Sequence, residues 1–412
     1  MIRGEGQSAS LRCSPVNCRK DFSILDIDDT VYLDSAATSL TPDCVLEKIG
    51  DYYQHYNANI HRGIHNWAET ATAAYEGVRS IIANFILTPG AEDSEIVFTS
   101  GTTHGINIVA NSFCADWDSN DQVIISEAEH HANIVPWQQL RDRSGVQLQV
   151  VSLNEKGYLE FEQLVDFLKR RFNRSLVAMS VLPNATGVIQ DWQKIGQLAK
   201  MYQANVLLDG AQSVPRIQTD VSDCDFLVFS GHKTYGPTGT GVLYAKKGLL
   251  DQSPPYMGGG DMIKTVSFDQ TTFNEMPWRY EAGTPNIAGI IGLGRAIEWI
   301  KEQGLDNITA HEASISDYAQ EALKSVERVS VFFPQTAKLG LVVFSVDSAQ
   351  SSDVATLLNT QQIAVRSGFL CAEPILRNRV GQGVLRASFG YYTTTEEIDK
   401  LVAALHKVLS IL

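Results

Sequence analysis

The sequence lacks two features that would direct a protein to a membrane or to nucleic acid: a long apolar run and an excess of positive charge. No stretch reaches the roughly 20 apolar residues that span a bilayer. Lys and Arg total 33 against 47 Asp and Glu in 412 residues, a formal net charge of −14. Nucleic acids and anionic membranes bind basic surfaces. We therefore expect neither nucleic acid nor membrane as a partner.

Cysteine is also scarce. The six cysteines are Cys13, Cys18, Cys44, Cys114, Cys224 and Cys371. Only Cys13 and Cys18 are close together, and no second Cys or His pair lies near them to complete a zinc site. Zinc is therefore the weaker interpretation, and we predict no bound metal. Dispersed thiols are typical of a reducing compartment, and the polar first 28 residues lack the apolar core of a signal peptide. Both features predict a cytoplasmic protein.

Short β-branched and apolar runs alternate with amphipathic segments over residues 30–247. The runs typical of buried strands are residues 95–99, 122–126, 147–151, 176–180, 205–208 and 226–229. Helical patterns cover residues 72–85, 134–143, 161–171 and 192–202. This alternation predicts an α/β fold with a mainly parallel sheet wrapped by helices. Ligands of such sheets bind beyond the carboxyl ends of the strands.

The remainder of the chain has a different pattern of predicted elements. Residues 254–285 are rich in Gly and Pro and predict loops, and a helical pattern follows at 286–303. Shorter strands at 339–346 and 385–389 and a helix at 395–412 complete the chain. We predict a flexible N-terminal lead-in at 1–28, a large domain at 29–290 and a smaller C-terminal α+β domain at 291–412.

Two neighbouring strand runs end in charged residues. One runs into Asp209, and the next runs into Ser230-Gly231-His232-Lys233. The spacing between Asp209 and Lys233 suffices for one crossover between adjacent parallel strands. Pyridoxal 5′-phosphate (PLP) requires this pair, a lysine for covalent attachment and an acid beside its pyridinium nitrogen. Either residue alone would be read as a surface lysine or a helix cap, and the pair favours PLP.

A phosphate group would need a cradle of donors. The strand run at 95–99 leads into Gly101-Thr102-Thr103 and then into a helical pattern. A Gly-led turn that opens a helix presents free backbone N–H groups to an anion, and the hydroxyls of Thr102 and Thr103 add donors. Ser230 and His232 would complete a phosphate site.

A further strand run ends at Glu129-His130-His131. Adjacent imidazoles bind metals in some proteins, but no acidic or Cys partner lies at ligand spacing here. A flat imidazole can also stack on a pyridine ring and relay a proton. We predict this role for His130, whereas a structural role is the simpler interpretation of His131.

The predicted small domain offers a nucleophile and an anion-binding residue. Cys371 lies in a Gly-hinged loop that ends at Pro374. An accessible thiol on such a loop is a candidate nucleophile, whereas buried thiols are usually inert. Arg386 lies inside an apolar strand run and therefore needs an anion. An amino-acid carboxylate and an internal salt bridge remain open as alternatives.

Together these residues resemble the class V aminotransferase family, and within it the SUF-type (group II) cysteine desulfurases. The shared motifs are YLDSAAT, HRGIH, GTTHGIN, EHHANIVPW, DGAQ, FSGHKTYGPTGTGVLY, YEAGTPN, VRSGFLCAEP and LRASF. They cover the chain from about Phe22 to Leu412. The resemblance implies a PLP-dependent fold type I homodimer with its active site at the subunit interface. It also implies an enzyme that takes sulfur from L-cysteine as a persulfide on Cys371 and releases alanine. A sulfur-acceptor protein, as in Fe–S cluster assembly, would then receive the sulfur.

The resemblance also implies residue roles. Lys233 would hold PLP, Asp209 would pair with the ring nitrogen, and His130 would stack on the ring. Gln212 would contact the phenolic oxygen. Thr103, Ser230 and His232 would hold the phosphate, beside the Thr102 hydroxyl already singled out, with Thr284 reaching over from the partner chain. The substrate would be bound by Asn184, Arg366 and Arg386, with His61 and Arg62 at the entrance.

One position departs from the family pattern. Relatives usually carry a His immediately before the nucleophile, and here that residue is Leu370. An apolar side chain cannot promote ionisation of the Cys371 thiol as a protonated imidazole would, so we expect slow turnover. A selenocysteine lyase or a cysteine/cystine lyase is the alternative on the same fold. A non-catalytic PLP-binding scaffold is the alternative from another class.

Overall fold

The computed structural model describes residues 18–86 and 92–412. Its centre is a seven-stranded sheet with the order β2-β8-β7-β6-β5-β3-β4. The strands are β2 (Ile96–Thr99), β3 (Gln122–Ser126), β4 (Gln147–Val151), β5 (Ser175–Ser180), β6 (Asn205–Asp209), β7 (Phe226–Ser230) and β8 (Gly241–Ala245). Strand β8 runs antiparallel to both of its neighbours, β2 and β7, and the other neighbouring pairs are parallel. The mainly parallel sheet confirms the predicted architecture.

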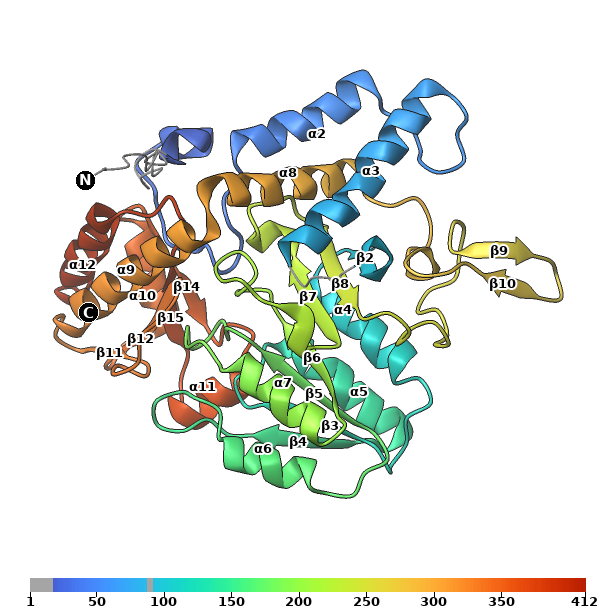
Figure 1. Cartoon of the computed structure of the whole chain (residues 1–412). Coiled ribbons are helices and arrows are strands. Elements are labelled where there is room, and N and C mark those ends of the chain that lie inside the picture. The colour runs from blue at the N-terminus through green and yellow to red at the C-terminus, as the bar shows by residue number, and fades with distance from the viewer. Residues whose placement is uncertain (1–17, 87–91) are drawn as a thin grey trace, which may run out of the picture.

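Both faces of this sheet are buried, which explains why its strands read as continuous apolar runs. In β5, Val177 and Met179 belong to one core cluster, whereas Leu176 and Ala178 belong to another. Successive side chains of a strand point to opposite faces, so each face carries its own core. The first face is covered by α3 (Asn66–Phe85), α7 (Trp192–Met201) and α8 (Ile287–Gln303), and the second by α4 (Thr102–Ile108) and α5 (Val135–Ser144). In Figure 1, α2 (Asp43–His55) and α3 lie along α8 at the top of the molecule.

A second, four-stranded antiparallel sheet forms the C-terminal part, with the order β11-β12-β15-β14. Its strands are β11 (Val329–Val331), β12 (Leu341–Val346), β14 (Arg366–Gly368) and β15 (Val384–Ser388). The helices α9 (Leu305–Lys324), α10 (Ser351–Asn359) and α12 (Thr395–Leu409) pack around a third core cluster. They lie together at the left of Figure 1. This is the smaller α+β unit that the sequence predicts.

The exact domain limits stay a prediction, and two segments show how closely the units are joined. The short strand β1 (Val31–Tyr32) pairs with β13 (Ile363–Ala364) in parallel. Phe22 is fully buried and packs edge-on against Trp299 and Tyr392. The described part of the N-terminal lead-in is therefore packed against the rest of the chain.

The stretch expected to be loops contains a β-hairpin. Strands β9 (Ile263–Val266) and β10 (Thr271–Phe273) pair antiparallel and project from the right of the molecule in Figure 1. Its strands are mostly exposed and polar, so no buried apolar run signalled them. Helices α6 (Phe161–Leu168) and α11 (Glu373–Arg379) are the remaining α-helices of the described residues. No helix in residues 18–86 and 92–412 is long and apolar enough to cross a membrane.

Candidate active site

A cavity of about 430 Å³ lies where strand ends of the large sheet meet the small unit. The parallel strands β3, β5, β6 and β7 place their carboxyl ends at one edge of the sheet, where ligands of such folds bind. The cavity is lined by Ala36, Ala37, Thr102, Thr103, His130, Ala132, Asn184, Asp209, Ala211, Ser230, His232, Lys233, Arg366, Ser367, Leu370, Cys371 and Arg386. It therefore brings together most of the residues that the sequence singled out.

Asp209 and Lys233 line the same cavity, as their strand-end positions predicted. Asp209 is the last residue of β6, and its Oδ1 accepts a hydrogen bond from the backbone N–H of Ala211 at 2.9 Å. Burial lowers the pKa of Lys233 to about 8, and the Asp209 carboxylate opposes that shift. Burial likewise raises the pKa of Asp209, with the Lys233 charge acting against it. The arrangement makes the Lys233 amine a better nucleophile near neutral pH than an exposed lysine.

The turn at Thr102 is fixed against the end of β7. The backbone N–H of Thr102 donates to Ser230 Oγ at 2.9 Å, and the two hydroxyls lie 2.8 Å apart. Gly231 must remain glycine, because a Cβ atom there would lie 2.1 Å from Thr240 Oγ1. Thr103 and His232 also line the cavity, and burial lowers the pKa of His232 to about 4. Hydroxyls and a neutral imidazole thus gather where a phosphate was predicted.

His130 faces the cavity as a neutral ring. Its Nδ1 accepts a hydrogen bond from the N–H of Ala132 at 3.0 Å, which places the ring proton on Nε2. Burial, assisted by the positive charge of Lys233, lowers the pKa of His130 to about 3. A neutral, flat imidazole held in this way fits the predicted stacking role.

Arg386 combines the two alternatives that the sequence left open. It is 2% exposed and shares Asp34 with Arg366: Arg366 Nη2 lies 2.7 Å from Asp34 Oδ2, whereas Arg386 Nη2 lies 3.4 Å from Asp34 Oδ1. The Nε of Arg386 has no hydrogen-bond partner among the described residues. Burial lowers the pKa of Arg386 to about 10 despite the nearby carboxylate. This buried cation is therefore incompletely paired on the wall of the cavity, which favours an incoming anion.

Asp34 is a site residue that the sequence reasoning missed. It lies in the YLDSAAT motif, two residues after the short β1 strand, and its partner Arg366 lies 332 residues further along the sequence. An acid at a strand end was a signal for Asp209, and the same signal was available for Asp34.

Cys371 is exposed and lies on the loop between β14 and α11. Both Leu370 and Cys371 have left-handed backbone conformations, with φ of 52° and 53°. The side-chain amide of Asn184 donates to the carbonyl oxygen of Leu370 at 2.7 Å. Asn184 thus holds the Cys371 loop in this structure, and its role toward the substrate carboxylate stays a prediction.

Four predicted residues do not line the cavity. Gln212 is buried beside it, where its Nε2 donates to the carbonyl oxygen of Ala36 at 2.7 Å. The other three, His61, Arg62 and Thr284, are exposed. His61 Nε2 lies 2.8 Å from Glu76 Oε1, and Arg62 Nε lies 3.3 Å from Asp261 Oδ1. Their predicted contributions at a subunit interface stay predictions.

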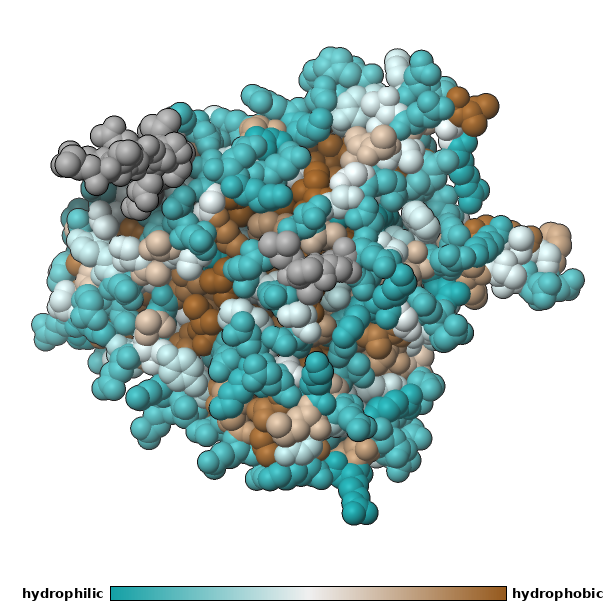
Figure 2. Space-filling model, viewed as in Figure 1, coloured by the Kyte–Doolittle hydropathy of each residue, from teal (hydrophilic) through white to brown (hydrophobic). Residues whose placement is uncertain are grey.

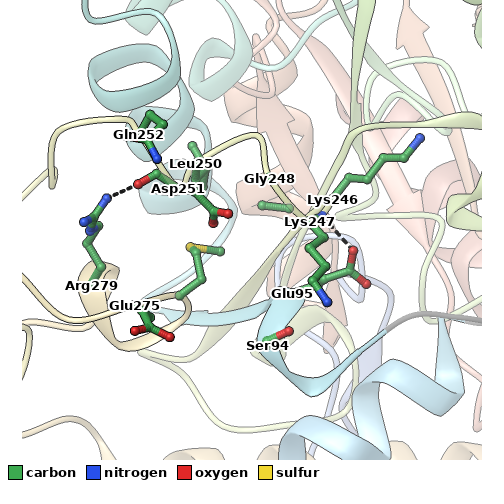
Figure 3. A pocket seen from close by; sticks show the side chains of 12 residues that line it. Ser94, Glu95, Lys246, Lys247, Gly248, Leu250, Asp251, Gln252, Glu275 and Arg279 are labelled. Carbon is green, nitrogen blue, oxygen red and sulfur yellow. Dashed lines mark hydrogen bonds between the residues drawn. The ribbon is translucent and has the colours of Figure 1, made fainter.

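A second hollow of about 480 Å³ lies beside the end of β8 (Figure 3). Its buried acid, Glu95, accepts backbone N–H groups of Lys247 at 2.7 Å and of Glu92 at 2.8 Å. Arg279 donates to the carbonyl oxygen of Asp251. Because these charged groups are already paired within the chain, this hollow does not compete with the first as an active site. No group of three metal-ligating side chains gathers within the described ranges.

The groups around the first cavity fit PLP. A lysine amine, a buried carboxylate, the hydroxyls of Thr102 and Ser230 and the flat neutral imidazole of His130 all line the cavity. The incompletely paired Arg386 leaves room for a carboxylate of a bound amino acid.

Proteins of similar sequence support this assignment. The class V aminotransferase family model matches residues 31–401. A cysteine desulfurase of Enterobacter sp. (strain 638) is 44% identical over 398 residues, covering 95% of this chain and 97% of the relative. A probable cysteine desulfurase of Halalkalibacterium halodurans is 42% identical over 396 residues, covering 94% of this chain and 96% of the relative.

Two solved structures have the same fold over nearly the whole chain. The apo cysteine desulfurase of Thermococcus onnurineus NA1 has a TM-score of 0.91 at 36% identity and covers 98% of this chain and 100% of its own. The Escherichia coli cysteine desulfurase CsdA, in an S-sulfonic acid form, has a TM-score of 0.89 at 37% identity, with 97% and 99% covered. The chain belongs to the class V aminotransferase family. Its cofactor is PLP, and the predicted fold class is confirmed.

Proposed function

We propose that this enzyme is a cysteine desulfurase, which converts L-cysteine to L-alanine and leaves the sulfur as a persulfide on Cys371. The observation that carries the proposal is the cavity that Lys233, Arg386 and Cys371 line together. An amine base, an anion-binding guanidinium and an exposed thiol are the three groups that this reaction requires. The relatives named cysteine desulfurase support the assignment.

Arg386 orients the substrate by its carboxylate, because it is buried and lacks a partner at Nε. Lys233 lines the cavity, where its free amine would serve as a base for the Cα proton and as a proton donor to Cβ. Bound PLP supplies the electron sink that stabilises negative charge at Cα. Asp209 and His130 would hold the cofactor ring, with Asp209 as the partner of its nitrogen and His130 as the stacking residue.

Cys371 accepts the sulfur. Its thiolate attacks the substrate sulfur, an S–S bond forms as the Cβ–S bond breaks, and the electron pair of that bond remains with the carbon fragment. Protonation of the fragment then gives alanine. The position of Cys371 on an exposed loop leaves the persulfide accessible to an acceptor. We propose a sulfur-acceptor protein as the partner in that second step.

The test is incubation of the holoenzyme with L-cysteine. We expect equimolar alanine and persulfide in the first turnover, with mass spectrometry locating one extra sulfur on Cys371. Cys371→Ala should bind L-cysteine, as seen in the visible spectrum, without forming alanine. Alanine formation at the wild-type rate by this variant would remove Cys371 from the reaction. Parallel assays with L-selenocysteine and L-cystine separate the desulfurase from the lyase alternatives.

We also propose that the enzyme works as a homodimer in the cytoplasm. His61, Arg62 and Thr284 are exposed outside the cavity, as residues that serve a partner subunit would be. The α2–α3 loop carries Ile64, which is 95% exposed. A brown patch lies at the upper right of Figure 2, where Figure 1 shows this loop. Light scattering measures the mass, and mixing Lys233→Ala with Thr284→Ala subunits tests sharing: restored activity would require a site built from two chains. Cys44, Cys114, Cys224 and Cys371 are free thiols, which agrees with a reducing compartment.

A further inference from the structure

The backbone at the nucleophile is strained. Leu370 and Cys371 are consecutive residues with side chains, and their φ values of 52° and 53° lie in the left-handed region. That region is disfavoured for residues that carry a Cβ atom. The chain uses no glycine at either position. Within the turn, the N–H of Ala372 donates to the carbonyl oxygen of Phe369 at 2.8 Å, and contacts from outside the loop add to this bond in holding the conformation.

Three hydrogen bonds reach the loop from the large unit. Asn184 Nδ2 donates to the carbonyl oxygen of Leu370 at 2.7 Å. The backbone N–H of His131 donates to the carbonyl oxygen of Cys371, also at 2.7 Å. The backbone N–H of Glu373 donates to Nε2 of His131 at 3.1 Å. His131 therefore binds the chain at Cys371 and again two residues later.

His131 is bonded to the backbone on both sides of Ala372, yet it does not line the cavity. Its Nε2 acts as an acceptor, so the ring is neutral with its proton on Nδ1. The residue before it, His130, does line the cavity. One short segment at the end of β3 thus places a ring beside the cofactor site and fixes the loop that carries the thiol.

We propose that His131 is a positioning residue for Cys371: its imidazole and its backbone N–H hold the left-handed turn that places the thiol at the cavity. The inference rests on the proposed function, since it assigns a role in the sulfur-transfer step. A merely structural His131 would contribute to the stability of the fold. A positioning His131 also sets the reactivity of the Cys371 thiol and the rate at which sulfur is transferred to it.

The test compares His131→Phe with His131→Gln in the holoenzyme. Phenylalanine keeps the ring shape without an acceptor, whereas the glutamine Oε1 offers an acceptor of similar reach. Single-turnover alanine formation should fall about tenfold or more in His131→Phe and recover largely in His131→Gln. PLP content, the visible spectrum and the KM for L-cysteine should stay near wild type. The rate of alkylation of Cys371 by iodoacetamide, measured without substrate, should change in the phenylalanine variant alone.

Glu373→Ala is the matched control, because it keeps the backbone N–H that His131 accepts and removes only the side chain paired with Arg377. It should leave both rates unchanged. Equal rates in wild type and His131→Phe would overturn the proposal, as would equal losses in the phenylalanine and glutamine variants. If His131→Phe does not fold, His131→Leu takes its place with the same expectations. If the wild type forms no alanine, the proposed function fails, while the alkylation rates still decide whether His131 positions the loop.

Discussion

Burial and the neighbouring Asp209 charge act in opposite directions on the pKa of Lys233. Burial lowers its pKa to about 8; the Asp209 carboxylate raises the pKa, and the guanidinium groups of Arg386 and Arg216 lower it. The lysine therefore loses its proton at lower pH than the ordinary value of 10.5. Only the neutral amine attacks the aldehyde of PLP.

The rate at which the apo-protein takes up PLP should consequently rise with pH through about 8 and then level off. Stopped-flow absorbance of the bound cofactor measures this rate. Asp209→Asn removes a negative charge that favours the protonated amine, so its rising limb should move to lower pH. A rate that keeps rising to the pH of an ordinary lysine would contradict the assignment.

Arg386 allows a second prediction at the same scale. Arg386→Ala should raise the KM for L-cysteine about tenfold or more, because the carboxylate loses a buried partner, and should lower kcat less. Cysteamine, which lacks the carboxylate, provides the control. Wild type should prefer L-cysteine to cysteamine strongly in kcat/KM, and the variant should not. If Arg386→Ala still prefers L-cysteine to cysteamine, Arg386 serves only the internal ion pair with Asp34.

At the scale of elements, the close approach of β8 to the turn after β2 determines the geometry of the predicted phosphate site. A Cβ atom on Gly241 would lie 2.4 Å from the Cα of Gly101. Gly241 also pairs with Ser230 in β7, so any displacement there moves both sides of the Thr102–Ser230 contact.

Gly241→Ala should therefore weaken PLP binding about tenfold or more, measured by titration of the apo-protein and by fluorescence of the bound cofactor. Gly77→Ala in α3 is the control, since no atom lies within 4 Å of its added Cβ and alanine is favoured in a helix. The control should bind PLP as wild type does. Equal affinity in both variants would show that the approach of β8 does not shape the site.

Elements also show what the sequence could and could not reveal. Asp209, Ser230 and Lys233 were predictable because parallel strands end at one edge, so residues after successive strands must meet. The contact of Asp34 with Arg366 was not predictable, because it joins the segment after β1 to β14 of the second sheet. The left-handed turn at Leu370 and Cys371 also gave no signal, because neither is a residue that favours that conformation. Roles carried by tertiary hydrogen bonds, such as those of His131, become visible only in three dimensions.

At the scale of the whole molecule, a buried ion pair joins the two units. Arg216 Nε lies 2.6 Å from Glu312 Oε2 of α9, and the two side chains are 4% and 1% exposed. Arg216 also donates to the carbonyl oxygen of Phe389 at 3.2 Å and to Gln212 Oε1, likewise at 3.2 Å. Removing one partner of such a pair leaves an uncompensated buried charge.

Arg216→Met should destabilise the protein by about 3–5 kcal/mol in urea unfolding, because Glu312 remains buried without its cation. The double variant Arg216→Met/Glu312→Leu should recover much of this loss, since neither charge then remains. An equal loss in single and double variants would mean that packing, and not charge, dominates at this contact.

The active cavity draws its walls from the ends of five strands of one sheet, and from two strands and a loop of the other. An unfolded chain cannot assemble such a surface, so the cofactor binds the folded state alone. By mass action, PLP at one hundred times its Kd adds about 2.7 kcal/mol to the free energy of unfolding. The cellular amount of this enzyme should thus follow cofactor supply, because chains left without PLP spend more time open to proteases.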